Sequence, residues 1–422
     1  MTAPREMRLA GVVVAGRPGL ADVHVHGARI EAVTPVAGAP GPDTDVVLPG
    51  LVDLHTHLRQ PGGEEAETID SGTRAAAAGG FTDVFAMANT SPVTDTVDRV
   101  ERVRDWARTA SARVHPVAAA TIGLAGHDLV DVDRLADAGV TVFSDDGRCV
   151  DDAALVLALL RAAARHGTVF AQHAQSGSIV RDGVVNARVA ATLGVPGWPA
   201  EGEQAVIGRD LALAAATGGH LHVCHVSTAG AVDLVRAARR AGLPVTAEVT
   251  PHHLVLTDAD AVRHGPALKV NPPLRAAHDV HAVRAALLDG TIDIVATDHA
   301  PHPARTKTGS WQDAAFGLTA LETALAVTAE VCTSGTTVDW ATVARVLSTR
   351  PAEIGRIDGQ AGRPIVAGGP ATFCVVRRAP WRVDPADGFS RSSNTPFTAR
   401  QFQHRVVLTV LDGRITHDSR DR

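Results

Sequence analysis

The stretch Asp53-Leu54-His55-Thr56-His57 closes an apolar, β-branched run of the sequence. Side chains alternate between the two faces of a β-strand, so Asp53, His55 and His57 are expected on one face and Leu54 on the packed face. Imidazole nitrogens and carboxylate oxygens are ligands that suit zinc. This stretch therefore predicts a strand whose end delivers side chains to a metal site.

Runs of the same kind recur along the chain, and alanine-rich segments that favour helices separate them. The eight runs are 48–57, 81–89, 113–121, 140–146, 169–173, 220–228, 244–250 and 292–299. The expected helices include 71–78, 152–165, 204–216 and 229–241. Strands that alternate with helices are typical of a parallel sheet, and eight such units predict an α/β fold of the (β/α)8 TIM-barrel type, with its active site at the carboxyl ends of the strands.

Both ends of the chain carry short alternating runs instead. Residues 11–35 contain a Gly-Arg-Pro-Gly turn, and residues 371–378 and 406–416 read as further strands, the last one broken by an Asp412-Gly413 turn. Proline- and glycine-rich patches at 38–42 and 359–369 mark the boundaries. We therefore expect a small β-sandwich domain formed by residues 1–47 and 359–422, and a barrel formed by residues 48–358.

Four other runs end in residues that can bind metals. Asp145 and Asp146 end the fourth run, His173 the fifth, His225 the sixth and Asp298 the eighth. In a closed barrel the eighth strand lies beside the first, which favours metal ligation and proton transfer by Asp298 over a helix N-cap. Two neighbouring metal ions can make hydroxide from water and polarise a carbonyl group, so this set predicts a two-metal hydrolase.

A two-metal site also needs an anion that bridges the ions. The chain has two lysines, Lys269 and Lys307, and neither follows an early strand, so a carboxylated lysine is not expected. The best-placed anions are Asp145 and Asp146. Cys224 alternates away from His225 and is expected to face a helix rather than the metals.

A second His-x-His pair, His24 and His26, has the same spacing as His55 and His57. It lies in the expected β domain and precedes Gly27 and a new strand. A lone pair of this kind is a weak signal, so we expect surface or edge-strand histidines here.

Composition limits the classes of function. The chain has 422 residues, 45% hydrophobic and 20% charged residues and a net charge of −6, which does not indicate a nucleic-acid or membrane surface and favours a small-molecule partner. The four cysteines lie far apart without Cys-x-x-Cys spacing, which argues against a disulfide framework. Residues 1–16 lack a signal-peptide pattern and no apolar stretch is long enough to span a membrane, so we expect a soluble protein of the cytoplasm.

Across nearly its full length the chain resembles the class I dihydroorotases of the amidohydrolase superfamily. The motifs that carry the resemblance are Asp53-Leu-His-Thr-His-Leu-Arg-Gln-Pro-Gly62, Met87-Ala-Asn-Thr90, Phe143-Ser-Asp-Asp-Gly147, His225-Val-Ser-Thr228, Glu248-Val-Thr-Pro-His-His253, Asn271-Pro-Pro-Leu-Arg275 and Thr297-Asp-His-Ala-Pro-His302. The resemblance implies two Zn²⁺ ions. One is bound by His55, His57 and Asp298, the other by His173 and His225, and Asp146 bridges them.

The resemblance also implies the reaction and the substrate contacts. The reaction is the reversible cyclisation of N-carbamoyl-L-aspartate to L-dihydroorotate in pyrimidine synthesis. Asp298 is the implied proton carrier, and the implied substrate contacts are Arg59, Asn89, His302, Asn271, Phe316 and Gly317. The segment 303–317 is expected to close over the substrate.

Three positions depart from the family pattern. The segment 171–175 reads Ala-Gln-His-Ala-Gln where the family has His-Cys-Glu-Asp after the fifth strand, and alanine replaces a common proline at Ala88 and Ala315. Two alternatives stay open: another cyclic amidase, such as a hydantoinase or allantoinase, and a non-catalytic scaffold that supports aspartate transcarbamoylase. A homo-oligomer and aspartate transcarbamoylase are the expected protein partners.

Overall fold

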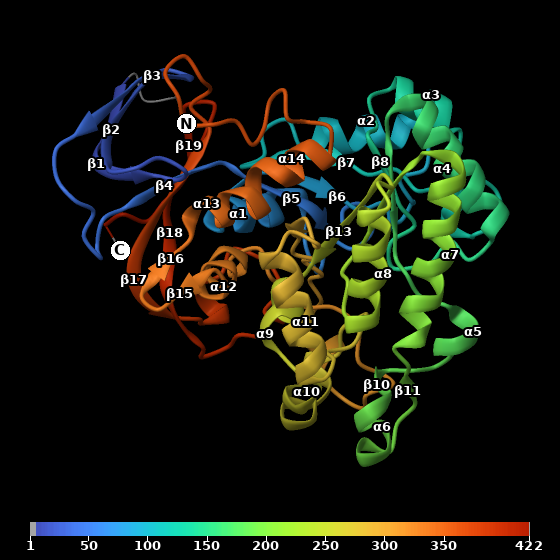
Figure 1. Cartoon of the computed structure of the whole chain (residues 1–422). Coiled ribbons are helices and arrows are strands. Elements are labelled where there is room, and N and C mark those ends of the chain that lie inside the picture. Colours follow the sequence, from blue (N-terminus) through green and yellow to red (C-terminus); the bar gives the residue numbers. More distant parts are fainter. Residues whose placement is uncertain (1–5, 422) are drawn as a thin grey trace.

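Gly50 lies between two strands of different sheets within the first expected run. Figure 1 shows how the strands and helices are arranged. The computed structural model describes residues 6–421, so residues 1–5 of the expected small domain and residue 422 lie outside the described residues. The strand β4 (Val46–Pro49) pairs with β17 (Phe373–Arg382), whereas β5 (Leu51–Thr56) pairs with β6 (Phe81–Ala86). A Cβ atom at position 50 would lie 2.3 Å from Oγ1 of Thr82, so this close approach requires glycine. The expected run 48–57 is thus two strands of different sheets.

Both chain ends contribute to one seven-stranded sheet, as the sequence predicts. Its spatial order is β19-β18-β17-β4-β1-β2-β3. The remaining strands of this sheet are β1 (Glu6–Val14), β2 (Leu20–His26), β3 (Arg29–Val36), β18 (Gln401–Leu411) and β19 (Arg414–Asp418). Apolar side chains of β1–β3 share one buried cluster with those of β4, β17 and β18. The hydrogen-bonded strands therefore form a single sheet around a core of their own.

The second group of strands is parallel, and every one of the eight expected runs contains one of them. The strands are β5, β6, β7 (Arg113–Pro116), β8 (Val142–Phe143), β9 (Val169–Gln172), β12 (His220–Val223), β13 (Val245–Val249) and β14 (Ile294–Val295). Ladders connect them in the orders β5-β6-β7 and β8-β9-β12-β13-β14. Two parallel bridges, Ala118 with Phe143 and Thr56 with His299, link these two sheets at both of their edges.

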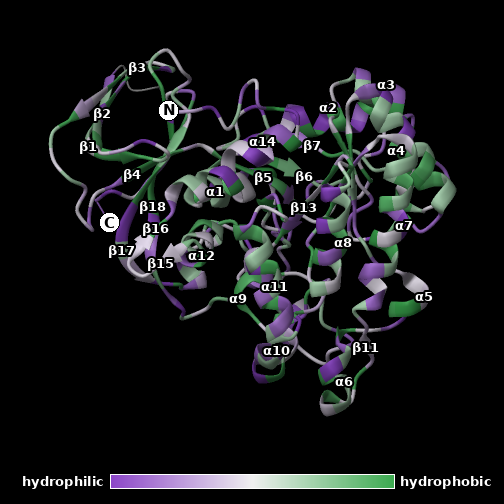
Figure 2. Cartoon of the chain, in the orientation of Figure 1, coloured by the Kyte–Doolittle hydropathy of each residue, from purple (hydrophilic) through white to green (hydrophobic). Residues whose placement is uncertain are grey.

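Helices follow the parallel strands along the chain, and several of them, including α1, α4, α7 and α8, pack against these strands. The helices are α1 (Ile69–Ala78), α2 (Val97–Trp106), α3 (Val132–Asp137), α4 (Ala153–His166), α5 (Gly177–Val180), α6 (Ala187–Leu193), α7 (Glu201–Thr217), α8 (Ala229–Arg240), α9 (Pro251–Val255), α10 (Asp258–His264), α11 (Ala277–Leu288), α12 (Ala324–Val331), α13 (Trp340–Ala344) and α14 (Arg350–Ile354). Figure 2 shows hydrophilic and hydrophobic residues alternating along α8 and α11. In α8, Val232 and Val235 are buried while Asp233 and Arg236 are not, as expected for a helix with one face on a sheet.

Short elements complete the fold. The two-residue strands β10 (Val185–Asn186) and β11 (Gly197–Trp198) pair with each other, as do β15 (Thr333–Ser334) and β16 (Thr337–Val338). Within residues 6–421, no helix combines the length and the apolar composition that crossing a membrane requires.

Candidate metal centre

The ends of five parallel strands converge on one buried cluster of imidazoles and carboxylates. No member of this cluster is more than 5% exposed; the members are His55, His57, Asp146, His173, His225 and Asp298. They form two groups of closely spaced ligand atoms. The first contains His55, His57, Asp146 and Asp298, and the second contains Asp146, His173 and His225. Asp146 thus belongs to both groups.

Asp146 presents one carboxylate oxygen to each pair of histidines. Its Oδ2 lies 3.1 Å from Nε2 of His55 and 3.3 Å from Nε2 of His57. Its Oδ1 lies 3.1 Å from Nδ1 of His173 and 3.3 Å from Nε2 of His225. A carboxylate in this position can bind two cations at once.

Asp298 completes the first group. Its Oδ1 lies 3.1 Å from Nε2 of His57 and 3.5 Å from Nε2 of His55. Burial alone would raise the pKa of Asp298, but the contact with His57 and the nearby His55 hold the pKa at about 2. Asp298 is therefore an anion that can share a cation.

The donor atoms fit divalent metal ions. Zinc binds imidazole nitrogen and carboxylate oxygen at about 2.0–2.2 Å in tetrahedral geometry, which places neighbouring ligand atoms about 3.3–3.5 Å apart. Here Nδ1 of His173 lies 2.9 Å from Nε2 of His225, and the contacts of Asp146 and Asp298 with the histidines span 3.1–3.5 Å. Nε2 of His55 is buried and makes no hydrogen bond of good geometry among the described residues, although Oδ2 of Asp146 lies 3.1 Å away. A buried nitrogen rarely lacks a partner, so a cation in the first group would satisfy it.

The other ring nitrogens of three histidines are held by acceptors. Nδ1 of His55 donates to Oε1 of Glu248 at 2.6 Å, and Nδ1 of His57 donates to Oδ1 of Asn89 at 2.9 Å. Nε2 of His173 donates to Oε1 of Gln175 at 2.7 Å. Such partners fix the tautomer that leaves the opposite nitrogen free for a metal.

Gln175 supplies the support for His173 at a position where the chain departs from the family pattern. The same oxygen, Oε1, also accepts a hydrogen bond of 3.0 Å from Nδ2 of Asn271. Gln175 therefore connects a candidate metal ligand to an expected substrate contact. A neutral amide oxygen therefore accepts the hydrogen bond of this histidine.

The electrostatics of the cluster favour bound positive charge. Burial by itself would lower the pKa of His55, but the charges of Asp146 and Glu248 bring the pKa well above its ordinary value. Burial would raise the pKa of Asp146, but His55, together with hydrogen bonds from His173 and His225, brings it well below its ordinary value. The carboxylates of this pocket thus attract cations, whether protons or metal ions.

Asp53 and Asp145 face away from both groups. Oδ1 of Asp53 accepts from the backbone N–H of Thr297 at 2.8 Å, which ties β5 to the end of β14. Oδ1 of Asp145 accepts from the backbone N–H groups of Ala120 and Thr121 at 2.8 and 2.9 Å. Neither aspartate belongs to a group of possible ligands within residues 6–421. The expectation that Asp53 shares the face of the two histidines is therefore wrong, and its carboxylate instead positions the strand ends.

Cys224 lies among the strands, which corrects the expectation that it faces a helix. It packs in the interior cluster that contains Leu54 and Val52, and it forms a third group of possible ligands with His55 and Glu248. Strict alternation fails because β12 ends at Val223 and because β5 has a register shift between Asp53 and Thr56. Burial and the charge of Glu248 raise the pKa of the Cys224 thiol, and a protonated thiol is a poor metal ligand.

Three residues at the site have a backbone conformation that is rare outside glycine. Arg59, His225 and Asp298 have positive φ angles of 59°, 32° and 43°. Strain of this kind persists where the surrounding structure enforces it, and it concentrates at functional sites. The three residues follow β5, β12 and β14, so the strained backbone lies where these strands lead into the site.

The expected substrate contacts lie beside the metal cluster. Nε of Arg59 donates to the carbonyl oxygen of Pro301 at 3.2 Å, and Nη2 lies 3.4 Å from Nε2 of His302. Nε2 of His302 donates to the carbonyl oxygen of Phe316 at 2.7 Å. Burial and the charge of Arg59 lower the pKa of His302 to about 3, so its ring is neutral.

Asn394 is a site residue that the sequence did not reveal. Its Oδ1 accepts from the backbone N–H of His302 at 3.1 Å, and its Nδ2 donates to the carbonyl oxygens of Ala300 and Gly317 at 3.0 and 3.1 Å. It comes from the segment between β17 and β18, far from these residues in sequence. No local pattern could have indicated this placement.

His24 and His26 lie away from the metal cluster on β2 of the seven-stranded sheet. β2 pairs with strands on both sides, so it is not an edge strand. His26 is exposed, and neither histidine belongs to a group of possible ligands within the described part of the chain.

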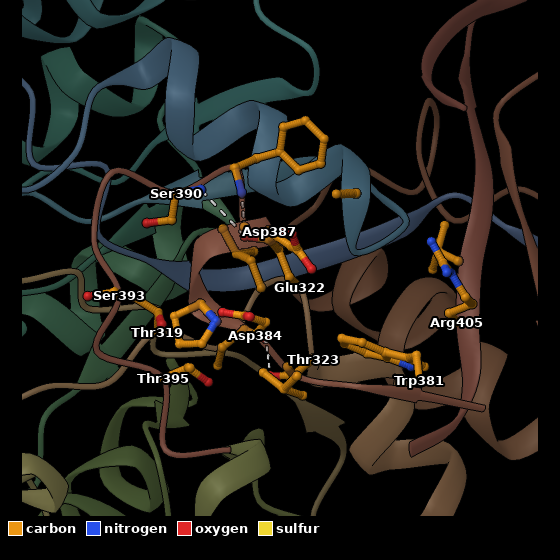
Figure 3. Close-up of a pocket in the computed structure, with 18 of the residues that line it drawn as sticks. Thr319, Glu322, Thr323, Trp381, Asp384, Asp387, Ser390, Ser393, Thr395 and Arg405 are labelled. Carbon is orange, nitrogen blue, oxygen red and sulfur yellow. Dashed lines mark hydrogen bonds between the residues drawn. The ribbon is translucent and has the colours of Figure 1, made fainter. Parts of the chain in front are cut away.

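A second cavity, of about 410 Å³, has His299 among its lining residues but none of the six candidate metal residues. Figure 3 shows Glu322 and Ser390 among the residues that line this cavity, and the backbone N–H groups of Phe389 and Ser390 reach the carboxylate of Glu322. Oε1 of Glu322 accepts from these two N–H groups at 3.0 and 3.4 Å, and burial raises its pKa to about 7. The cavity is therefore distinct from the metal centre.

Known proteins resemble the chain over most of its length. A family model described as dihydro-orotase-like matches residues 44–231. The chain is 49% identical over 418 residues to a dihydroorotase of Streptomyces coelicolor, which covers 96% of each chain. It is 44% identical over 382 residues to a dihydroorotase of Mycobacterium tuberculosis, which covers 88% of this chain and 87% of the other.

Solved structures share the fold. An L-hydantoinase (dihydropyrimidinase) from Arthrobacter aurescens superposes with a TM-score of 0.85 at 23% identity, covering 98% of this chain and 96% of that one. A dihydropyrimidinase from Brevibacillus agri gives a TM-score of 0.85 at 22% identity, covering 98% and 95%. At these identities the likeness concerns the fold alone.

Proposed function

The chain belongs to the dihydroorotase family, and from this premise we propose that its metal centre catalyses the reversible cyclisation of N-carbamoyl-L-aspartate to L-dihydroorotate, as a class I enzyme of the amidohydrolase superfamily. The chain is a cyclic amide hydrolase. The observation that carries the proposal is the position of Asp146, whose two oxygens face the His55–His57 pair and the His173–His225 pair.

The proposal extends to the architecture. The eight parallel strands form a closed (β/α)8 barrel, because parallel bridges join the two parallel sheets at both edges. The barrel spans residues 48–358, and the two ends of the chain, within residues 6–47 and 359–421, form the small β domain around the seven-stranded sheet, with β4 continuing that sheet to Pro49. The chain works in the cytoplasm, where its four free cysteines would stay reduced.

Two Zn²⁺ ions, when bound, would supply a Lewis acid for the carbonyl oxygen and lower the pKa of the attacking water. His55, His57 and Asp298 would hold one ion, and His173 and His225 the other. The shared ligand is Asp146. Glu248, Asn89 and Gln175 keep three of these histidines in the tautomer that binding requires.

Asp298 moves the proton. In ring opening, its carboxylate accepts a proton from the attacking water and returns it to the ring nitrogen as the C–N bond breaks. Cyclisation runs through the same positions in reverse, so Asp298 takes the proton of the attacking carbamoyl nitrogen. The proposal is supported by the contact of its Oδ1 with Nε2 of the proposed ligand His57, at 3.1 Å.

The carboxylate of the substrate lies against Arg59, Asn89 and His302. A guanidinium group can donate two parallel hydrogen bonds to a carboxylate, and Arg59 is held in place through Nε by Pro301. Asn89 already uses Oδ1 for His57, which leaves its amide N–H groups for the substrate. Asn271, Phe316 and Gly317 contact the ring or its open form.

A comparison of substrates tests the activity. We expect the purified protein to turn over dihydroorotate at least ~100-fold faster, in kcat/KM, than hydantoin or allantoin, a difference of about 2.7 kcal/mol. Preference for hydantoin or allantoin would make the chain a different cyclic amidase. Absence of turnover with zinc bound would favour a scaffold that supports aspartate transcarbamoylase, which gel filtration with that enzyme would detect.

The two His-x-His pairs supply a matched control. His55→Ala should lose zinc and abolish turnover, whereas His24→Ala combined with His26→Ala should leave both near those of the unmodified chain. Zinc loss in the second variant would contradict the assignment of the metal centre to the parallel strands.

A further inference from the structure

The two lysines of the chain join two segments that flank the metal centre. Nζ of Lys307 donates to the carbonyl oxygens of Lys269 and Ala315, at 2.8 Å each. Nζ of Lys269 donates to the carbonyl oxygen of Gln312 at 3.1 Å and lies 4.2 Å from the centre of the Phe316 ring. Segment 303–317 is thereby fastened to the segment that contains Lys269.

Both ammonium groups are buried, although their hydrogen bonds go to backbone carbonyl oxygens and not to carboxylates. Lys269 is 3% exposed and Lys307 is 6% exposed. Burial and the neighbouring charge of Lys269 lower the pKa of Lys307 to about 7. The charge of Asp313 offsets part of this effect at Lys269, but burial still lowers the pKa of both lysines, so fold stability alone does not explain this arrangement.

The fastened segments carry the expected substrate contacts. The carbonyl oxygen of Phe316 accepts from His302 at 2.7 Å, and the backbone N–H of Gly317 donates to the carbonyl oxygen of Lys269 at 3.1 Å. Asn271 lies two residues after Lys269. The lysines therefore connect one segment that ends in Phe316 and Gly317 with another that leads into Asn271.

The shape of the cation matters at this junction. An ammonium group is compact and can direct its donors at two converging carbonyl oxygens, whereas a guanidinium group is planar and larger. Lys307, between Lys269 and Ala315, needs the compact group. Lys269 faces a ring and one carbonyl oxygen, and a guanidinium group could also occupy that position.

We propose that Lys269 and Lys307 are positioning residues that hold segment 303–317 closed beside the metal centre and so present His302, Phe316 and Gly317 to the substrate. This inference rests on the proposed function. The lysines act through the segment they fasten and do not touch the reacting atoms.

Steady-state kinetics with dihydroorotate test the proposal. Lys269→Met and Lys307→Met should each raise KM at least ~10-fold while kcat stays within ~3-fold, because the loss falls on substrate binding and not on the chemical step. Lys269→Arg should keep KM within ~3-fold because the cation over the Phe316 ring is retained. Zinc content and circular dichroism should match those of the unmodified chain.

Arg305→Met is the matched control, since it removes a cation from the same segment. Arg305 pairs with Glu65 on the surface, where their side chains are 65% and 62% exposed, so its loss should leave KM within ~3-fold. Unchanged KM in both lysine-to-methionine variants would overturn the proposal. An equal rise of KM in Arg305→Met would also overturn it, because the effect would then follow from charge and not from the lysine contacts.

Proteolysis gives a readout that does not need catalysis. Chymotrypsin can cleave the segment after Trp311 or Phe316, and Trp311 is only 8% exposed. Cleavage there should be at least ~10-fold faster in Lys307→Met than in the unmodified chain or in Arg305→Met, since cleavage follows the population of the open segment. Equal cleavage rates would overturn the proposal, whereas faster cleavage in a chain that does not turn over dihydroorotate would refute the proposed function and leave the fastening intact.

Discussion

Adjacent aspartates at the end of β8 allow a sharp test of the metal centre. Asp146 faces both histidine pairs, whereas Asp145 accepts hydrogen bonds from the backbone N–H groups of Ala120 and Thr121. Asp146→Ala should remove the ligand that both groups share, with loss of at least one zinc ion and a fall in kcat/KM of at least ~100-fold, about 2.7 kcal/mol. Asp145→Ala should retain the metals.

Loss of Asp145 should instead lower the stability of the fold. Asp145→Ala leaves two buried N–H groups without an acceptor, at about 1–3 kcal/mol each, so the free energy of unfolding should fall by roughly 2–6 kcal/mol. Asp145→Asn keeps an oxygen in the position of Oδ1, and its loss should be smaller. The two variants of position 145 therefore separate fold from metal binding.

Metal analysis by mass spectrometry, thermal unfolding and dihydroorotate turnover on the same preparations distinguish these outcomes. Zinc loss in Asp145→Ala together with zinc retention in Asp146→Ala would refute the placement of the bridging carboxylate. Added bicarbonate should leave the activity of the unmodified chain unchanged, because an aspartate, unlike a carboxylated lysine, needs no dissolved CO2 to be an anion.

Three further substitutions address the substrate side, the support of a ligand and the cavity that His299 lines. Arg59→Lys keeps the charge but loses bidentate geometry, so kcat/KM should fall at least ~10-fold with zinc content unchanged, and normal kinetics would remove Arg59 from the substrate site. Gln175→Ala leaves Nε2 of His173 without its acceptor, so titration with a chelator should show zinc bound ~10–100-fold more weakly, and unchanged affinity would contradict that support. Burial raises the pKa of Glu322 to about 7, so its protonated form contributes to the stability of the fold. This contribution is complete below the ordinary pKa of a glutamate and is lost as the pH rises through about 7. The melting temperature of Glu322→Gln minus that of the unmodified chain should therefore increase as the pH rises from 5 to 8. A difference that stays constant would show that Glu322 does not titrate in this range.

The sequence predicts the strands well because period-two and helical patterns are local. Each of the eight expected runs contains a parallel strand, and both chain ends join one sheet. The break at Gly50 was not predicted, because apolar residues continue through it and the cause is the approach of Thr82 from another strand. Contacts between distant segments leave no local signal.

The same limit applies to the site. His55, Asp146 and Asp298 could be chosen from their places at strand ends, and the structure brings them together. The directions in which the side chains of Asp53 and Cys224 point could not be predicted. A register shift on β5 and the positive φ of His225 break the alternation on which that reasoning depends. The position of Asn394 and the contacts of Lys307 could not be predicted either, because they depend on the packing of loops that are distant in sequence.

The number of zinc ions per chain tests the central claim most directly. We expect the dialysed, active protein to hold about two zinc ions per chain, with turnover lost on chelation and recovered as both ions return. One ion or none per chain at full dihydroorotase activity would contradict a centre in which Asp146 joins two histidine pairs.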